Sequence, residues 1–179
     1  MRRLLREGGC NLKKYIVISG LLLLVGCSNG LDTSQLSESQ QGEEGFIKFY
    51  NAPSVEVALD ALPYEVNLPE RLPFETAGFK SLGITDFGGK GQNPEAQFIA
   101  LNEKENNLIL STTTAQLEYP HSNPEEITLD NGYEAFYTAP DGLDVIVKDI
   151  TYSYKLIMPE LEEQQVKEEL LKLAEQLSE

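Results

Sequence analysis

From residue 78 to residue 158 the sequence repeats one pattern, in which short segments that alternate apolar and polar residues are separated by turn residues. Most of the connections are too short for the helical crossover that a parallel strand pair needs, so neighbouring strands are expected to pair antiparallel. The pattern therefore predicts an antiparallel sheet. Its expected strands are residues 78–87, 96–102, 107–114, 125–130, 133–139, 143–150 and 151–158.

Two helices are expected to flank this sheet. Ser54 is a good N-cap for a short helix, which Pro63 ends. Residues 64–68 then lie between prolines and are predicted to form a short extended strand at a sheet edge. Residues 160–178 form an amphipathic helix that should cover one face of the sheet, with Lys172 on its polar side. Its apolar stripe is Leu161, Val166, Leu170, Leu173, Ala174 and Leu177. The predicted fold class is α+β.

The start of the chain has the organisation of a secretory signal. Residues 1–14 carry five basic and one acidic side chain, and residues 15–25 are almost wholly apolar. This run is too short for a membrane-spanning helix, which takes about 20 residues. It ends in Leu24-Val25-Gly26-Cys27, which resembles the bacterial lipobox. The alternative interpretation is an ordinary buried cysteine behind a core helix.

The lipobox resemblance implies removal of residues 1–26 and a lipid on Cys27. Cys27 would become an S-diacylglycerol cysteine, with or without an acyl group on its amino nitrogen. The resemblance places the protein on the outer face of the cytoplasmic membrane, with the membrane as a partner through the lipid anchor. The only other cysteine, Cys10, lies in the segment that would be removed, so the mature chain has no pair of thiols for a disulfide.

Charge and composition divide the mature chain into a tether and a domain. Removing five basic residues and one acidic residue changes the formal net charge from −15 to −19. Such an acidic chain excludes nucleic acid as a partner, since phosphate binding needs clustered lysine and arginine. Residues 27–45 comprise the lipidated cysteine and a polar stretch with two leucines, which predicts a flexible tether. Residues 46–179 are predicted to form a single extracytoplasmic domain.

The order of elements after residue 53 is similar to a bacterial family of unknown function. The similarity rests on the Leu-Pro repeats in LPYEVNLPERLPF, on the succession of strands and on the terminal helix PELEEQQVKEELLKLAEQL. Members occur in lipoproteins of Gram-positive, Bacillus-type spore-formers and as extracytoplasmic domains of anti-sigma-factor and sporulation proteins. The resemblance implies a curved sheet that cradles a helix, and it supplies no catalytic residues.

The sequence contains no recognisable catalytic or metal-binding constellation. His121 is the only histidine and lies between two prolines, without partners for catalysis or metal binding. The segment GGKGQNP at 88–94 lacks the phosphate-loop spacing and is expected to be a hairpin loop. The Asp130-Asn131-Gly132 and Asp141-Gly142 sequences indicate turns. Four strand tyrosines could line a groove or pack in the core: Tyr133, Tyr137, Tyr152 and Tyr154. No catalytic residue, cofactor or metal is predicted.

These observations predict a membrane-anchored extracytoplasmic lipoprotein that is not an enzyme and that binds or senses an unknown envelope ligand or protein. One alternative is a carrier that holds a lipid or peptide in a groove between sheet and helix. The other is a hydrolase that uses paired carboxylates on an envelope glycan. A packed sheet–helix interface favours the binding module, an open apolar cavity the carrier, and two close carboxylates in a cleft the hydrolase.

Overall fold

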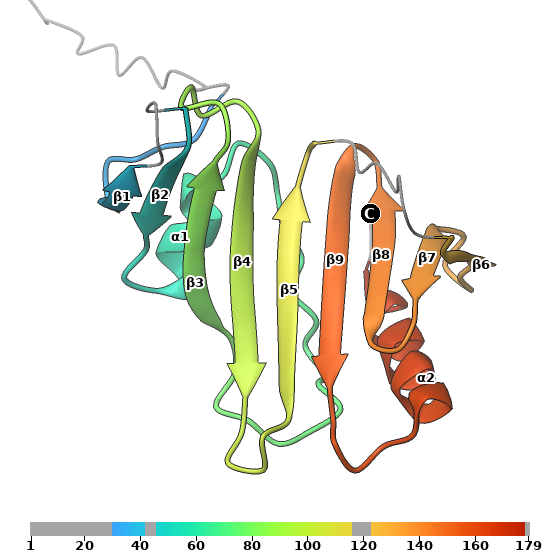
Figure 1. The fold of residues 1–179 in the computed structure, drawn as a ribbon. Coiled ribbons are helices and arrows are strands. Elements are labelled where there is room, and N and C mark those ends of the chain that lie inside the picture. Colours follow the sequence, from blue (N-terminus) through green and yellow to red (C-terminus); the bar gives the residue numbers. More distant parts are fainter. Residues whose placement is uncertain (1–29, 42–45, 116–122, 178–179) are drawn as a thin grey trace, which may run out of the picture.

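One nine-stranded antiparallel sheet forms the body of the protein (Figure 1). The computed structural model describes residues 30–41, 46–115 and 123–177. The strands lie in the order β1-β2-β3-β4-β5-β9-β8-β7-β6, so most chain neighbours are also sheet neighbours. They are β1 (Ser37–Gln41), β2 (Lys48–Asn51), β3 (Lys80–Asp86), β4 (Pro94–Leu101), β5 (Asn107–Thr113), β6 (Glu125–Thr128), β7 (Glu134–Thr138), β8 (Gly142–Val147) and β9 (Ile150–Ile157).

Both predicted helices form, α1 (Val55–Ala61) and α2 (Glu163–Ala174), and α2 is shorter than the predicted range 160–178. The Ser54 hydroxyl caps α1 by accepting a hydrogen bond from the backbone N–H of Val57 at 3.3 Å. At the start of α2, the backbone N–H of Glu162 donates to the Gln165 side chain at 3.0 Å. Local capping therefore fixes the start of both helices.

The predicted fold class is wrong, because the protein is mainly β and not α+β. In the described residues the nine strands dominate, and the two helices are short, with α2 packed mainly against β8 and β9. The expected strands from residue 78 onward all form, with slightly different ends. Residues 64–68 do not form an edge strand, and β1 and β2, which the sequence pattern does not predict, extend the sheet instead.

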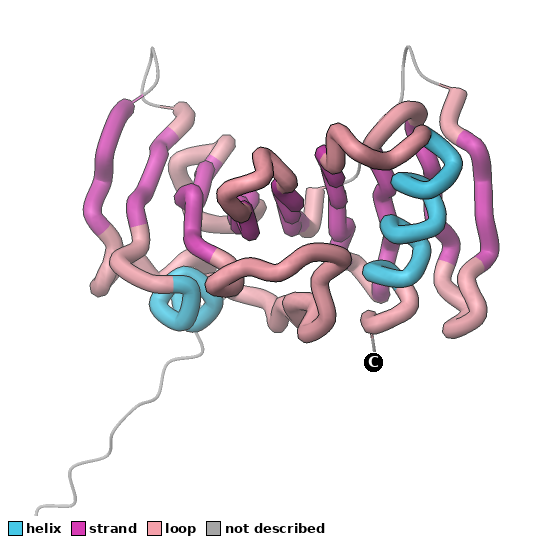
Figure 2. The backbone as a smooth tube through the Cα atoms, turned by 90° about the horizontal axis from the view of Figure 1, so that it is seen from below, coloured by secondary structure: helices cyan, strands magenta, loops and turns pink. Residues whose placement is uncertain are grey.

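Both helices lie on the same, concave face of the curved sheet (Figure 2). A long segment without regular structure, residues 62–79, runs between them across this face (Figure 1) and is called the crossing segment below. Val66, Leu68 and Phe79 of the crossing segment pack against both halves of the core, the half under α1 and the half under α2. The sheet thus has one covered face and one open face.

Hydrogen bonds from three directions fix the crossing segment. The Tyr64 hydroxyl lies 2.9 Å from the Pro94 carbonyl oxygen and 2.8 Å from that of Thr112, on strands β4 and β5. The backbone N–H of Arg71 donates to the Gln176 side chain, which donates back to the Arg71 carbonyl, both at 2.9 Å. The Thr76 hydroxyl donates to the Leu101 carbonyl at 2.7 Å. The proline-containing crossing segment therefore does not form a strand, and it is held in place as a cover over the sheet.

The predicted tether is wrong over residues 30–41, because these residues belong to the domain. β1 pairs with β2, and Leu31 and Leu36 pack against the core under α1. The backbone N–H of Leu31 donates to the Gly91 carbonyl at 2.8 Å, and that of Asp32 donates to Ala61 at 2.8 Å. The domain therefore starts near residue 30, and not at residue 46. Cys27 and the predicted signal, residues 1–26, lie outside the described residues.

Deleting the chain before Phe46 should lower the stability of the domain relative to a chain that starts at Ser28. Two half-buried leucines would lose their contacts, which corresponds to about 2 kcal/mol of apolar burial, and β2 would lose one of its two neighbouring strands and become the edge of the sheet. Thermal unfolding of both chains measures the difference. A chain that starts at Ser37 keeps β1 without the leucines and separates the two contributions. Equal midpoints for all three would contradict the packing of residues 30–41.

Candidate functional site

The open face of the sheet carries a group of apolar side chains that the fold leaves uncovered. We define the open-face patch as Leu82, Ile99, Leu101, Ile109 and Ile157, of which Ile99 and Ile109 are half-buried. The register pairs Ile99 with Ile109, and Leu101 and Ile157 both pair with Asn107, so the patch crosses adjacent strands. Leu82 is 48% exposed, Leu101 46% and Ile157 36%. In antiparallel sheets the solvent-facing side usually carries polar residues, and the open-face patch is an exception to this pattern.

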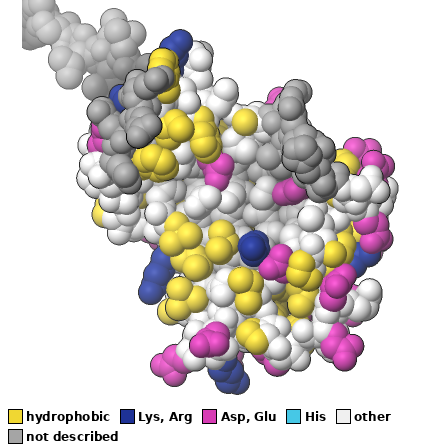
Figure 3. Space-filling view, in the orientation of Figure 1, with side chains coloured by type: hydrophobic (Ala, Val, Ile, Leu, Met, Phe, Trp, Pro, Cys, Tyr) yellow, Lys and Arg dark blue, Asp and Glu magenta, His cyan; other side chains and the backbone are white. Residues whose placement is uncertain are grey.

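Two lysines border the open-face patch. Lys80 pairs across the strands with Ile99, and Lys155 pairs with Ile109, so both lie on the patch side of the sheet. Lys155 is 3.8 Å from Asp141, and its side chain is 56% exposed. Figure 3 views this face and shows apolar side chains with charged atoms among them over its lower half. The arrangement suits a partner that is apolar with acidic groups at its edge.

The concave side of the sheet is filled by its own side chains. Tyr152, Tyr154, Leu156 and Leu170 are at most 2% exposed, and Tyr137 is also buried. Burial raises the pKa of Tyr64 to about 12, and it raises the pKa of Tyr154 further above its ordinary value. Three of the four strand tyrosines are therefore core residues, and Tyr133 packs against them partly buried.

Polar groups at the sheet–helix interface are largely satisfied. The backbone N–H of Asn67 donates to the Tyr152 hydroxyl at 3.3 Å. Among the described residues, the hydroxyls of Ser81, Thr112 and Tyr154 are buried without a hydrogen-bond partner. Thr112 and Tyr154 lie on the neighbouring strands β5 and β9, and Thr112 pairs with Tyr152, the tyrosine that Asn67 of the crossing segment contacts. A filled interface of this kind has no room for an acyl chain unless the crossing segment or α2 moves.

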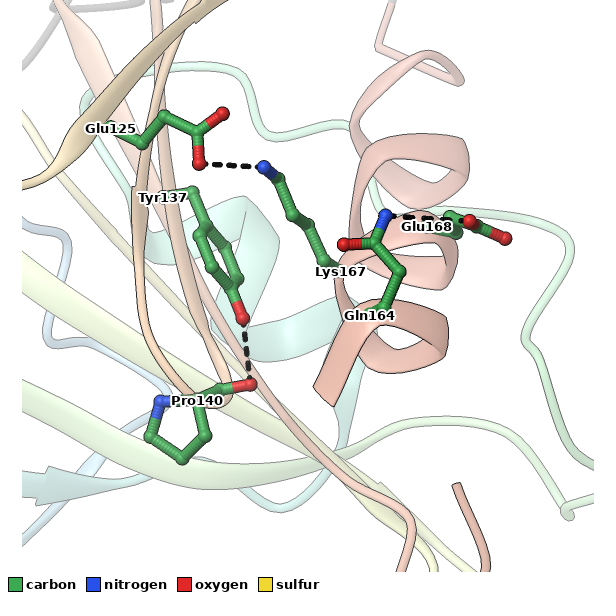
Figure 4. A network of polar contacts seen from close by, with 6 residues as sticks. All are labelled: Glu125, Tyr137, Pro140, Gln164, Lys167 and Glu168. Carbon is green, nitrogen blue, oxygen red and sulfur yellow. Dashed lines mark hydrogen bonds and ion pairs between the residues drawn. The ribbon is translucent and has the colours of Figure 1, made fainter. Parts of the chain in front are cut away.

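A polar network holds α2 to the outer strands β6 and β7 (Figure 4). The Lys167 ammonium is 2.6 Å from Glu125 and 5.0 Å from the centre of the Tyr137 ring. The Tyr137 hydroxyl donates to the Pro140 carbonyl at 2.9 Å. Burial raises the pKa of Tyr137, and the charges of Glu163, Asp141 and Glu125 add to this shift. The network joins helix to sheet, which is a structural role.

The buried carboxylate of Asp86 shapes the β3–β4 hairpin. Its oxygens accept backbone N–H groups from Gly91 at 2.7 Å and Gly88 at 3.3 Å. The predicted hairpin loop at 88–94 is confirmed, and Gly91 has a φ of 68°, which favours glycine. The carboxylate of Asp86 is thus occupied by backbone donors of its own hairpin loop.

The remaining predicted sites divide between turns and residues outside the described part. Asn131 and Gly132 form the predicted turn, and the Asn131 amide donates to the carbonyls of Ala174 and Leu177 at 3.3 Å, capping the end of α2. Asp141 lies in the turn between β7 and β8, and Gly142 is the first residue of β8. His121 and Cys27 lie outside the described residues. Within the described ranges, no three His, Cys, Asp or Glu side chains come together as metal ligands would.

The grooves on the surface of the described residues are open to solvent and are lined by both polar and apolar side chains. One of about 550 Å³ lies between the start of α1 and the end of the crossing segment, lined by Val55, Leu68 and Phe79 among others. Another of about 450 Å³ lies between α2 and the crossing segment, beside Arg71 and Lys172. Neither gathers the convergent polar groups of a cofactor site.

Comparison with known proteins gives no relative from which a function could be transferred. No family model matches the chain, and no curated protein or solved structure matches it. The similarity to the family of unknown function therefore stays a prediction. Neither helix in the described ranges has the length and apolar character that crossing a membrane requires.

Proposed function

We propose that the protein is a lipid-anchored binding module of the cell envelope that uses the open-face patch to hold an envelope protein. The single observation that carries the binding role is an apolar patch on one face of a sheet whose other face is covered by both helices and the crossing segment. Soluble domains rarely expose a contiguous apolar patch, and such a patch commonly marks a site of interaction with a partner.

The sequence before Cys27 supports the anchor. A basic segment, a short apolar segment and a lipobox-like end stand in the order that lipoprotein signals require. The lipid would hold the domain at the outer face of the cytoplasmic membrane. The net negative charge of the domain itself gives no attraction to anionic lipids. The anchored protein then acts as a receptor or sensor and not as an enzyme.

Charge narrows the class of partner. The mature chain is strongly acidic, so an acidic partner is attracted only where lysines stand out from the surface. Lys80 and Lys155 do so at the border of the patch. We therefore assign the patch to a protein surface that is apolar at its centre and acidic at its edge. The filled interior favours this binding role over a carrier, which needs a cavity for its cargo.

Site-specific photo-crosslinking in cells tests the proposal. A photoreactive side chain in place of Ile157 should give a discrete protein adduct, because this position lies in the patch. The matched control is Ile146, which is also an exposed isoleucine on the open face, at 41% against 36%, but lies outside the patch. The same adduct should weaken when Lys155→Glu is added, since an acidic partner would then be repelled.

Each outcome decides the proposal. An adduct at 157 that is absent at 146 and sensitive to Lys155→Glu supports the acidic partner. An adduct of twice the mass of the chain identifies a second copy as the occupant and contradicts a different partner. Equal adducts at both positions, or no effect of Lys155→Glu, contradict the patch as a specific site.

A further inference from the structure

The β3–β4 hairpin lies at the end of the sheet where the chain enters the domain. Gly30, the first described residue, lies so close to the hairpin that a Cβ on it would meet the Gly91 carbonyl oxygen at 3.1 Å. The next residue, Leu31, donates to the same oxygen at 2.8 Å. The start of the domain is therefore fastened to the hairpin and cannot swing away from it without breaking these contacts.

Only two residues, Ser28 and Asn29, separate Cys27 from Gly30. A chain of three residues spans at most about 11 Å even when fully extended. The polar layer of a leaflet is itself about 5–8 Å thick, by the difference between the whole bilayer and its hydrocarbon core. A lipid on Cys27 would therefore hold the hairpin within reach of the headgroups.

Two exposed aromatic side chains leave the sheet at this same end. Lys48 pairs with Asp86 at this end of β2 and β3. Phe87 directly follows Asp86, and Phe46 lies two residues before Lys48. Phe46 is 63% exposed and Phe87 is 52% exposed, which is high for side chains of this size. Figure 3 shows an apolar group at the upper left, over the β2–β3 end.

We propose that the hairpin end of the sheet, with Phe46, Phe87 and Lys90, rests on the lipid surface and fixes the orientation of the domain. Phenylalanine side chains gain free energy when they enter the boundary between headgroups and acyl chains. Lys90 is exposed at the tip of the hairpin, where its ammonium can meet lipid phosphates. This inference rests on the proposed lipid anchor at Cys27.

The orientation would keep the open-face patch away from the membrane. Leu101 lies at the far end of β4, an eight-residue strand, which places it about 23 Å from the hairpin end. Ile157 lies at the same level of the sheet as Leu101, because both residues pair with Asn107. The strands would point away from the lipid surface and leave the patch free to bind a protein partner.

Two lysines in the loops that precede and follow β4, Lys90 and Lys104, provide a matched pair of probe sites. Lys90→Cys places a thiol at the hairpin and Lys104→Cys places one at the far turn, and both side chains are exposed. The lipidated chain has no other free thiol, so an environment-sensitive dye attaches only at the new cysteine. The full mature protein is reconstituted into phosphatidylcholine vesicles, with and without phosphatidylglycerol, that carry headgroup-region spin labels as quenchers.

The dye at position 90 should be quenched several-fold more than the dye at position 104. Adding Phe46→Asp and Phe87→Asp should reduce the quenching at 90, because the hairpin would lose its apolar contact with lipid. Equal, weak quenching at both sites would overturn the fixed orientation, and stronger quenching at 104 would place the wrong end on the membrane. Unchanged quenching in the double aspartate variant would overturn the aromatic contact. Stronger quenching with phosphatidylglycerol supports the role of Lys90.

Failure of the anchor itself gives a different result. The protein without an introduced cysteine should take up no dye, because its one cysteine is blocked by the thioether. Dye on that protein, together with failure to float with the vesicles, would refute the lipid on Cys27. Flotation without dye uptake, combined with equal quenching at 90 and 104, would refute only the orientation.

Discussion

Leu170→Asp should abolish folding of the domain or leave it barely stable. Leu170 is 0% exposed and lies in the core that α2 forms with β8 and β9. The change removes a buried leucine and places a carboxylate among apolar side chains with no basic partner in the described core. We expect a loss of about 3–5 kcal/mol or more, comparable with the whole stability of a small domain. Thermal unfolding of the soluble mature domain measures the loss.

Lys172→Asp is the matched control, because it introduces the same side chain on the opposite side of α2. Lys172 is exposed, and its ammonium is 2.7 Å from Glu169, an ion pair that raises the pKa of the lysine. Exposed pairs of this kind contribute little to stability, so the midpoint should shift far less. A Leu170→Asp protein that folds like the parent but loses an envelope partner would show that α2 is a docking element and does not cover the core.

The strands after residue 78 could be predicted because each one combines a binary pattern with turn residues at both ends. In β9, for example, the tyrosines at 152 and 154 alternate with exposed or half-buried positions and all point into the core with Leu156. The stripe of α2 is equally clear, since its predicted buried positions Val166, Leu170 and Leu173 are buried. Local periodicity determines these elements, and the sequence displays it directly.

The fold class could not be predicted in the same way, because it depends on what covers the sheet. β1 is Ser-Glu-Ser-Gln-Gln, which has no alternation of apolar and polar residues. It forms a strand because its backbone pairs with β2. The prolines of the crossing segment indicate extended chain, but its place across the concave face follows from contacts with distant residues such as Gln176. Long-range contacts of this kind leave no local signal.

The open-face patch also escaped prediction, although part of its signal is in the sequence. Ile99 and Leu101 occupy positions of β4 that alternate with buried ones, and so do Ile109 and Ile157 in their strands. Apolar residues at both sets of positions usually indicate a strand buried on both faces. Only the strand register shows that these residues meet, and only the placement of both helices on the other face shows that they are uncovered.

Cys27→Ser should detach the protein from the membrane or leave it unprocessed with its signal attached. Serine offers no thiolate for transfer of the lipid, so neither the thioether nor the processing that depends on it can form. Two acyl chains hold a protein firmly because each buried CH₂ contributes ~0.8 kcal/mol, whereas a single chain gives only marginal binding. Fractionation of cells, combined with the mass of the intact protein, measures both outcomes.

Cys10→Ser is the control for this change, because it makes the same substitution within the segment that processing would remove. The mature protein should then have the parent's mass and remain with the membrane fraction. Mass also separates two kinds of membrane association in the Cys27→Ser protein, since an uncleaved signal adds residues 1–26 and its apolar run can hold the chain at the membrane. A Cys27→Ser protein of the parent's mass in the membrane fraction would contradict the lipid anchor. The hairpin end of the sheet would then contact the lipid surface through its own side chains alone, Phe46, Phe87 and Lys90.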